Sequence, residues 1–230
     1  MNIAIIPARS GSKRIPKKNI KEFCGKPIIS YPISIALNSG IFDKVIVSTD
    51  CQEIAKISEE YGAEVPFLRE KNLSDDFSNT HEVIGSVVNK LIEKFQLKLK
   101  FVCCIYATSS LMQQDDLLKG FNLIKSKKWE VVFSATKFSY PIMRSFKLNK
   151  DSSIEMFFPN YFFKRSQDLE EAYHDAGQFY WSHYSYWLGS QKKYNPSNTI
   201  VLIPSWRAQD IDNLEDWKRA EKIYKSIDEK

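Results

Sequence analysis

The chain has 230 residues, of which 43% are hydrophobic and 27% are charged, and its formal net charge is +5 at pH 7. This composition is typical of a folded globular protein and excludes a disordered chain, which needs lower hydrophobicity and a larger charge imbalance. The modest positive charge can attract phosphates or acidic sugars. However, no long run of lysine and arginine and no basic–aromatic pattern indicates a nucleic-acid partner.

The cysteines and the apolar stretches indicate in which cellular compartment the protein works. None of the four cysteines forms a C-x-x-C pair, and Cys103 and Cys104 lie in an apolar run, which predicts buried free thiols and a reducing compartment. No apolar stretch reaches membrane-spanning length, and the N-terminal apolar run is too short for a signal peptide. We therefore expect a cytoplasmic protein without a membrane partner.

Short apolar runs alternate with stretches of helical spacing along the chain. The predicted strands are Asn2–Pro7, Lys44–Thr49, Phe101–Tyr106, Glu130–Ala135, Gly177–Ser182 and Thr199–Pro204. The predicted helices are Ile28–Leu37, Gln52–Tyr61, Thr80–Phe95, Leu117–Ile124 and Leu214–Ile227, the last of them capped by Asn213. This alternation predicts a single α/β domain over residues 1–230, with a mostly parallel sheet and helices on both of its faces.

One interval interrupts the alternation. Residues 139–173 are aromatic and irregular, with FFPNYFFKRSQ at their centre. We interpret this interval as an excursion from the main domain. Exposed aromatic residues suit a subunit interface, and a lid or an edge hairpin fits the same composition equally well.

The strongest local signal is the segment Ala8–Asn19, here called the basic loop, which directly follows the first predicted strand. Open α/β sheets bind ligands beyond the carboxyl ends of their strands. Small residues around Gly11 let backbone N–H groups approach an anion, and Arg9, Lys13, Arg14 and Lys18 add positive charge. The loop matches neither the Walker A nor the dinucleotide pattern. We predict that it binds a polyphosphate.

A pair of carboxylates near the C-terminus provides the complementary signal. Asp210 and Asp212 are two residues apart, so their side chains point to the same side of an extended segment. Paired carboxylates suit Mg²⁺, which could bridge triphosphate oxygens. Capping of the last helix is the alternative role for such residues, and it would be favoured if the basic loop were absent.

Four motifs occur in the order found in one known family. The run Ile3–Asn19 resembles the signature of the acylneuraminate cytidylyltransferases, the CMP-sugar synthetases, and STD at Ser48–Asp50, LSDDFSNT at Leu73–Thr80 and QDIDN at Gln209–Asn213 follow. The resemblance covers nearly the whole chain. It implies a Rossmann-like nucleotidyltransferase fold with a small protruding dimerisation element, formed here by residues 139–173, and a homodimer.

The resemblance also implies roles for single residues. It places Arg9, Lys13 and Lys18 on the nucleotide loop and among the catalytic residues, together with Asp210. The further assignments are Asn19, Arg69 and Thr80 at the nucleoside, Gln178 near the sugar, and Asp210 and Asp212 as ligands of Mg²⁺.

The implied reaction is transfer of CMP from CTP to an acidic nine-carbon sugar, with release of pyrophosphate, for glycosylation of surface structures such as flagellin. Ile105–Leu111 and Glu171–Trp181 are most similar to members that act on pseudaminic acid. Sialic-acid members usually carry Q-P-T-S-P at Tyr106–Ser110 and Asn-Gly at Ala176–Gly177. Legionaminic, N-acetylneuraminic or 3-deoxy-octulosonic acid remains an alternative substrate, and a non-catalytic nucleotide-binding regulator is an alternative of another class.

Overall fold

A six-stranded sheet forms the centre of the computed structural model, which describes residues 1–74, 78–190 and 195–228. In spatial order its strands are β10 (Asn198–Leu202), β6 (Val131–Lys137), β9 (Tyr173–His183), β5 (Phe101–Ile105), β1 (Asn2–Pro7) and β4 (Lys44–Ser48). Strand β1 runs parallel to β4 and β5, and β10 runs parallel to β6, whereas β9 is antiparallel to both of its neighbours. The expected mostly parallel sheet is confirmed, with β9 as its one reversed strand.

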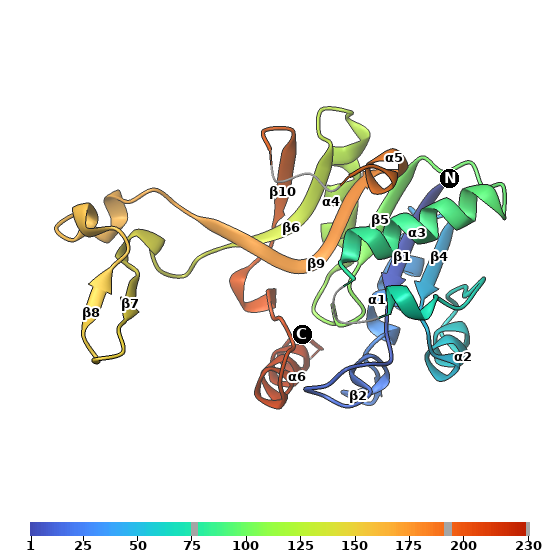
Figure 1. The fold of residues 1–230 in the computed structure, drawn as a ribbon, viewed down its shortest axis with the longest axis horizontal. Coiled ribbons are helices and arrows are strands. Elements are labelled where there is room, and N and C mark those ends of the chain that lie inside the picture. The colour runs from blue at the N-terminus through green and yellow to red at the C-terminus, as the bar shows by residue number, and fades with distance from the viewer. Residues whose placement is uncertain (75–77, 191–194, 229–230) are drawn as a thin grey trace.

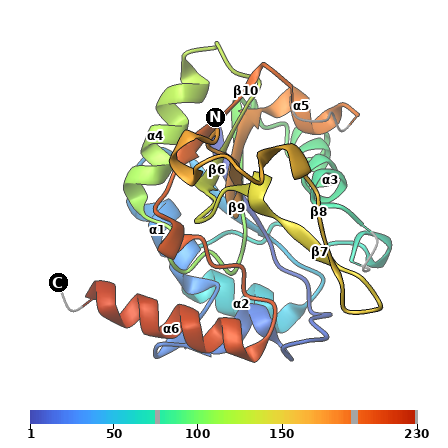
Figure 2. The same ribbon diagram turned by 90° about the vertical axis from the view of Figure 1, so that its left-hand side faces the viewer.

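Helices cover both faces of this sheet (Figures 1 and 2). The α-helices are α1 (Ser30–Asn38), α2 (Gln52–Glu60), α3 (Thr80–Glu93), α4 (Gln114–Lys125), α5 (Tyr184–Leu188) and α6 (Leu214–Asp228). Within β1, Ala4 and Ile6 belong to the buried cluster that contains α1, α2 and α4 residues, while Ile3 and Ile5 belong to the cluster that contains α3 and α5 residues. Because successive side chains of a strand alternate between faces, both faces are apolar and both need a helical cover.

Side-chain caps fix where two of the helices begin. The Asn79 side chain accepts a hydrogen bond from the backbone N–H of Glu82 at 2.9 Å, and the Glu82 carboxylate accepts one from the Asn79 N–H at 3.2 Å. Asn213 accepts hydrogen bonds from the backbone N–H groups of Glu215 at 2.8 Å and Asp216 at 3.0 Å, which confirms the predicted cap of α6. Both capped ends lie close to residues of the site described below.

Between β6 and β9 the chain leaves the body of the protein and returns (Figure 1). We call residues 139–172 the arm. It contains the antiparallel pair β7 (Phe146–Leu148) and β8 (Ile154–Met156) and three short 3₁₀ segments, Ile142–Arg144, Pro159–Tyr161 and Ser166–Asp168. Its apolar side chains are largely exposed, and they include Phe146, Leu148, Ile154, Phe157, Phe158, Phe162 and Phe163.

A bulge interrupts β9 at the level of the site. Tyr180 pairs with Phe133 and Asp175 pairs with Ala135, so residues 176–179 lie opposite Ser134 alone. The Ser134 hydroxyl accepts the N–H groups of Gln178 at 3.1 Å and of residue 179 at 3.3 Å. Gly177 has a φ of 61°, a conformation that other residues rarely adopt.

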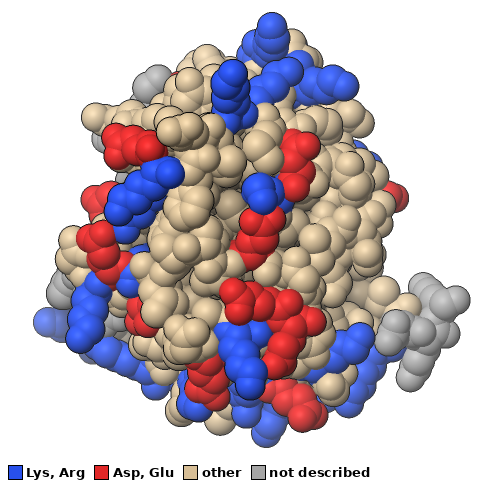
Figure 3. All heavy atoms as spheres, turned by 90° about the vertical axis from the view of Figure 1, so that its right-hand side faces the viewer, with Lys and Arg blue, Asp and Glu red and all other residues tan. Residues whose placement is uncertain are grey.

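Two further observations concern the surface. Within the described ranges, no helix is both long and apolar enough to cross a membrane. Figure 3 shows the side of the molecule at the right of Figure 1, where acidic and basic side chains are interspersed over the described residues. That face therefore lacks the continuous basic surface that binding to a nucleic-acid backbone requires.

Candidate active site

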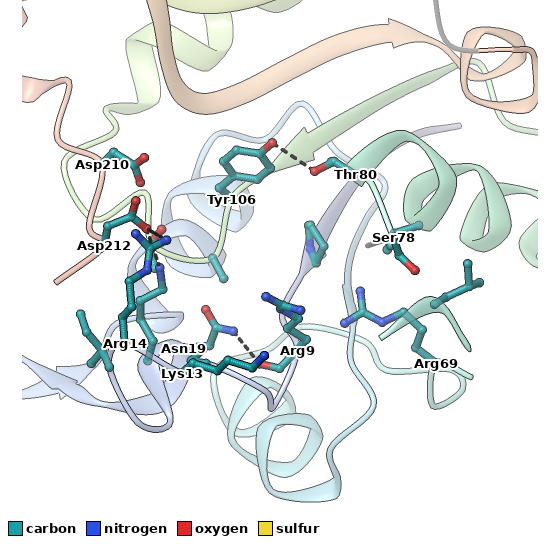
Figure 4. Close-up of a pocket in the computed structure, with 18 residues that line it drawn as sticks. Arg9, Lys13, Arg14, Asn19, Arg69, Ser78, Thr80, Tyr106, Asp210 and Asp212 are labelled. Atoms are coloured by element: carbon teal, nitrogen blue, oxygen red, sulfur yellow. Dashed lines mark hydrogen bonds and ion pairs between the residues drawn. The ribbon is translucent and has the colours of Figure 1, made fainter. Parts of the chain in front are cut away.

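A cavity of about 600 Å³ opens where the parallel strands β1 and β5 end (Figure 4). Residues that directly follow these two strands line it, as expected for a ligand site in an open α/β sheet. The cavity brings together the sequence-predicted residues Arg9, Lys13, Lys18, Asn19, Arg69, Thr80, Asp210 and Asp212. Their individual roles stay predictions.

Hydrogen bonds from Asp50 and Asn19 fix the backbone of the basic loop. The Asp50 carboxylate accepts the backbone N–H of Ser10 at 2.9 Å and the Ser10 hydroxyl at 2.8 Å. The Asn19 side-chain amide donates to the backbone carbonyl of Arg9 at 2.9 Å. Asp50 also lies 4.0 Å from the guanidinium of Arg69, whose side chain is buried. The loop and Arg69 therefore share one carboxylate anchor, just beyond the end of β4.

The environment of Asp50 favours its charged form. Burial raises the pKa of this carboxyl, but hydrogen bonds from Ser10 and the positive charge of Arg69 outweigh burial and bring the pKa below its usual value. Asp50 therefore remains a carboxylate at neutral pH and keeps both acceptor oxygens available to Ser10.

The two predicted metal carboxylates lie on one side of the cavity (Figure 4). Ile211 between them is buried against α6 and the N-terminal segment, so Asp210 and Asp212 point the other way. Lys18 donates to the Ile211 carbonyl at 2.7 Å, and Arg14 donates to the Asp212 carboxylate at 2.8 Å. The basic loop and the segment Asp210–Asp212 are thus hydrogen-bonded directly to each other.

This donor set fits a magnesium ion shared with a polyphosphate. Burial, followed by the negative charge of Asp212, raises the pKa of Asp210, and the positive charges of Lys18 and Arg14 offset this only in part. Among the described residues no group of three His, Cys, Asp or Glu side chains could hold a metal ion by itself. Mg²⁺ commonly uses one or two carboxylates and takes its other ligands from phosphates and water.

Another part of the cavity wall is uncharged. It consists of Thr80 at the start of α3 and the segment Tyr106–Thr108 after β5. The hydroxyls of Thr80 and Tyr106 lie 3.1 Å apart within hydrogen-bond reach (Figure 4). Tyr106 was not among the predicted site residues, although it lies in the segment Tyr106–Ser110, which differs from the Q-P-T-S-P pattern of sialic-acid members.

Gln178 lies apart from the other predicted residues. It does not line the cavity; its side chain is buried, and its amide donates to the Arg207 carbonyl at 2.8 Å. Arg207 in turn forms a bidentate ion pair with Asp116 of α4, and both side chains are buried. This buried pair, which the sequence did not predict, anchors the segment that leads to Asp210. The assignment of Gln178 to the sugar stays a prediction.

One sequence motif is only partly described by the structure, and one histidine lies outside the cavity. Residues 75–77 of the LSDDFSNT motif lie outside the described residues. His174 packs against Phe138 with ring centroids 4.7 Å apart and does not line the cavity.

The fold and the cavity together define a nucleotide-binding α/β protein, with a cationic loop and a carboxylate pair suited to a polyphosphate. The chain belongs to the cytidylyltransferase family, whose profile matches residues 3–185. It is therefore a nucleotidyltransferase that uses CTP.

Curated relatives match nearly the full chain. A pseudaminic acid cytidylyltransferase of Campylobacter jejuni subsp. jejuni serotype O:2 is 43% identical, over 97% of this chain and 96% of its own length. A CMP-N,N'-diacetyllegionaminic acid synthase of Legionella pneumophila is 31% identical, over 96% of this chain and 95% of its own. Among solved structures, a CMP:2-keto-3-deoxy-manno-octonic acid synthetase complexed with CTP superposes with a TM-score of 0.71 at 14% identity, covering 98% of this chain and 99% of that one, which confirms the fold.

Proposed function

We propose that the protein transfers CMP from CTP to the anomeric hydroxyl of pseudaminic acid, giving CMP-pseudaminic acid and pyrophosphate. The observation that carries the proposal is the 43% identity over nearly the full length to a pseudaminic acid cytidylyltransferase. The cavity supports it, because a cationic loop, a carboxylate pair and an uncharged wall offer separate surfaces to triphosphate, metal and sugar. The product would donate its sugar to surface structures such as flagellin.

The chemistry follows from the arrangement of charges. The sugar hydroxyl attacks the α-phosphorus of CTP in line, so its oxygen forms the new phosphoester bond while the bond to pyrophosphate breaks. The hydroxyl proton passes to a phosphate oxygen, and pyrophosphate leaves with the electron pair of the broken bond. Arg9, Lys13 and Lys18 neutralise the charge that accumulates on pyrophosphate. Asn19, Arg69 and Thr80 orient the nucleoside. Mg²⁺ held by Asp210 and Asp212 would supply further charge neutralisation at the phosphate oxygens.

A panel of acidic sugars tests the proposal. CMP transfer from CTP is measured with pseudaminic, legionaminic, N-acetylneuraminic and 3-deoxy-octulosonic acid, with Mg²⁺ and with a chelator. We expect the highest kcat/KM with pseudaminic acid and loss of transfer on chelation. A preference of tenfold or more for another sugar would overturn the substrate assignment, and the 31% identical legionaminic enzyme makes that sugar the first competitor.

The carboxylate pair is tested by substitution. Asp210→Asn removes one charged oxygen ligand at nearly unchanged volume, so we expect roughly hundredfold slower turnover with the fold retained. Asp115, exposed in the first turn of α4 and not part of the cavity lining, provides a matched control as Asp115→Asn. Near-normal Mg²⁺-dependent turnover of the Asp210 variant would show that the metal does not bind there.

We also propose that the arm mediates a homodimer. Its support is the apolar surface that the arm exposes, including Phe163 with 94% of its surface accessible and Leu148 with 71%.

The proposal that the enzyme works in the cytoplasm is supported by its use of CTP and by its four free cysteines.

A further inference from the structure

Asp210 and Asp212 lie on an irregular segment between β10 and α6, and each end of this segment is held by the body of the protein. At the downstream end the Asp216 carboxylate of α6 accepts the backbone N–H of Asp212 at 3.1 Å, and Ile211 is buried. At the upstream end lies Arg207, three residues before Asp210. Three residues span at most about 11 Å, so the place of Arg207 limits where the Asp210 carboxylate can reach.

Arg207 is fixed to two other parts of the fold. Its guanidinium forms a bidentate ion pair with Asp116 in the first turn of α4, in which the Nη2–Oδ1 distance is 3.2 Å. Its backbone carbonyl accepts the side-chain amide of Gln178 in β9 at 2.8 Å. Asp116 is itself fixed, because its carboxylate also accepts the backbone N–H of Gln113 at 3.2 Å, within the capping box of α4. The start of a helix and a central strand therefore hold the residue that leads to Asp210.

The burial of the Asp116–Arg207 pair argues for a role beyond stability. The side chain of Arg207 is 10% exposed and that of Asp116 is 3% exposed. Removing two charges from water costs much of what their attraction returns, so neutral residues of similar volume often serve stability equally well. A bidentate pair supplies what neutral residues lack, which is a fixed orientation of both side chains. Such a pair suits a position at which geometry decides function.

The pair can act on the site only through the backbone. Neither Arg207 nor Asp116 lines the cavity. The guanidinium of Arg207 is engaged by Asp116, and the cations that face the carboxylates of the site come from the basic loop instead. The contribution of Arg207 to the site is therefore the placement of the segment that follows it.

We propose that Asp116 and Arg207 form a positioning pair that places the Asp210 carboxylate so that it and Asp212 can share one divalent cation with the triphosphate of CTP. Asp210 depends on the pair more than Asp212 does, because Asp212 is also held by the start of α6. The inference rests on the proposed function and adds to it two residues that lie outside the cavity.

The experiment measures the affinity for CTP by calorimetry in the absence of sugar, once with Mg²⁺ and once with a chelator. The ratio of the two affinities reports how well the metal is held, and it requires no turnover. Arg207→Lys keeps the positive charge and loses the planar fork. We expect the affinity for CTP with Mg²⁺ to fall roughly tenfold, as for other residues that orient a metal ligand, and the affinity without metal to stay within twofold.

A double variant separates the position of the carboxylate from the stability of the fold. Asp116→Asn combined with Arg207→Met leaves no buried charge, and the new amide can still accept the Gln113 N–H, so the melting temperature should stay close to that of the parent. We expect the same selective loss of Mg²⁺-dependent affinity, by roughly tenfold to a hundredfold.

Leu91→Ala is the matched control for a purely structural effect. Leu91 is buried in the cluster of α3 and α5, on the face of the sheet opposite α4, and does not line the cavity. This variant should lower the melting temperature and leave both CTP affinities unchanged.

A double-mutant cycle identifies the carboxylate that the pair positions. Asp210→Asn removes the ligand itself, so it should cost less Mg²⁺-dependent affinity in the Arg207→Lys protein than in the parent. In the Leu91→Ala protein it should cost as much as in the parent.

Four results would overturn the inference. They are a stable double variant whose affinity for CTP with Mg²⁺ is within twofold of the parent, equal losses with and without Mg²⁺, the same selective loss in Leu91→Ala, and additive effects of Arg207→Lys and Asp210→Asn. A parent that binds CTP with Mg²⁺ in the expected way but transfers CMP to no acidic sugar overturns the proposed function alone.

Discussion

Asp50 connects the basic loop to the body of the protein through both of its carboxylate oxygens. Because folding lowers the pKa of Asp50, its carboxylate stabilises the folded protein at pH values above the ordinary aspartate pKa of about 3.9. This contribution disappears as the pH falls through the folded-state pKa. Asp50→Asn should therefore lower stability at pH 7 by about 1 kcal/mol. Thermal unfolding at pH 7 and pH 3 checks this, and an equally large difference at both pH values would contradict it.

Arg9 is expected to contact the triphosphate of CTP. A charge-assisted hydrogen bond is worth about 1.5–3 kcal/mol, so Arg9→Ala should lower kcat/KM for CTP roughly tenfold to a hundredfold. Arg9→Lys should rescue only part of the loss, because lysine lacks the planar fork of the guanidinium. Arg219→Ala on the exposed side of α6 is the matched control. Kinetics within twofold of the parent for Arg9→Ala would exclude the basic loop as the phosphate site.

At this scale the sequence identified the residues that occur in short motifs. Arg9, Lys13 and Asp210 belong to contiguous runs whose chemistry can be recognised without a structure. The hydrogen bond from the Tyr106 N–H to the Gln178 carbonyl and the ion pair between Asp116 and Arg207 join segments that are far apart in the chain. Such pairs depend on how the fold brings distant elements together, which no local pattern encodes.

Among the elements, the close packing of α5 on α3 has the strictest steric requirement. A Cβ at Gly85 of α3 would lie 2.4 Å from the backbone carbonyl oxygen of Trp187, which cannot move as a side chain can. We expect Gly85→Ala to destabilise the protein by about 1–3 kcal/mol, measured by denaturant unfolding. Gly11→Ala is the control, since a Cβ there meets no atom within 4 Å. Equal stability of the two variants would show that α5 can shift to make room.

The elements predicted well from the sequence are those with strong burial patterns. Strands β1, β4, β5 and β6 are largely buried apolar runs, and β1 was predicted with its observed bounds, Asn2–Pro7. Helix α5 was missed because five residues are too few to show a helical period. Helix α4 begins at Gln114, ahead of the predicted start at Leu117, because its first turn is polar and capped. Strands β7 and β8 are exposed, so no alternation of burial marks them.

For the molecule as a whole, the exposed arm leads to a prediction about assembly. Replacing both Phe162 and Phe163 by Asp should convert a dimer into monomers, because charges would then have to be buried in the interface. Light scattering at micromolar concentration checks this. Phe95→Asp, at an exposed position just beyond α3 and outside the arm, should leave the dimer intact. A monomeric parent protein would contradict the proposal.

The place of β9 in the sheet has a consequence for how the chain folds as it is synthesised. In the six-stranded sheet β6 pairs only with β9 and β10, so it has no strand partner until the ribosome has made residues beyond the arm. Strands β1, β4 and β5 can pair much earlier. We expect a nascent chain ending at residue 172 to protect the first half of the sheet from proteolysis and to leave β6 open to cleavage. Synthesis of β9 would then join the two halves of the sheet in one late step.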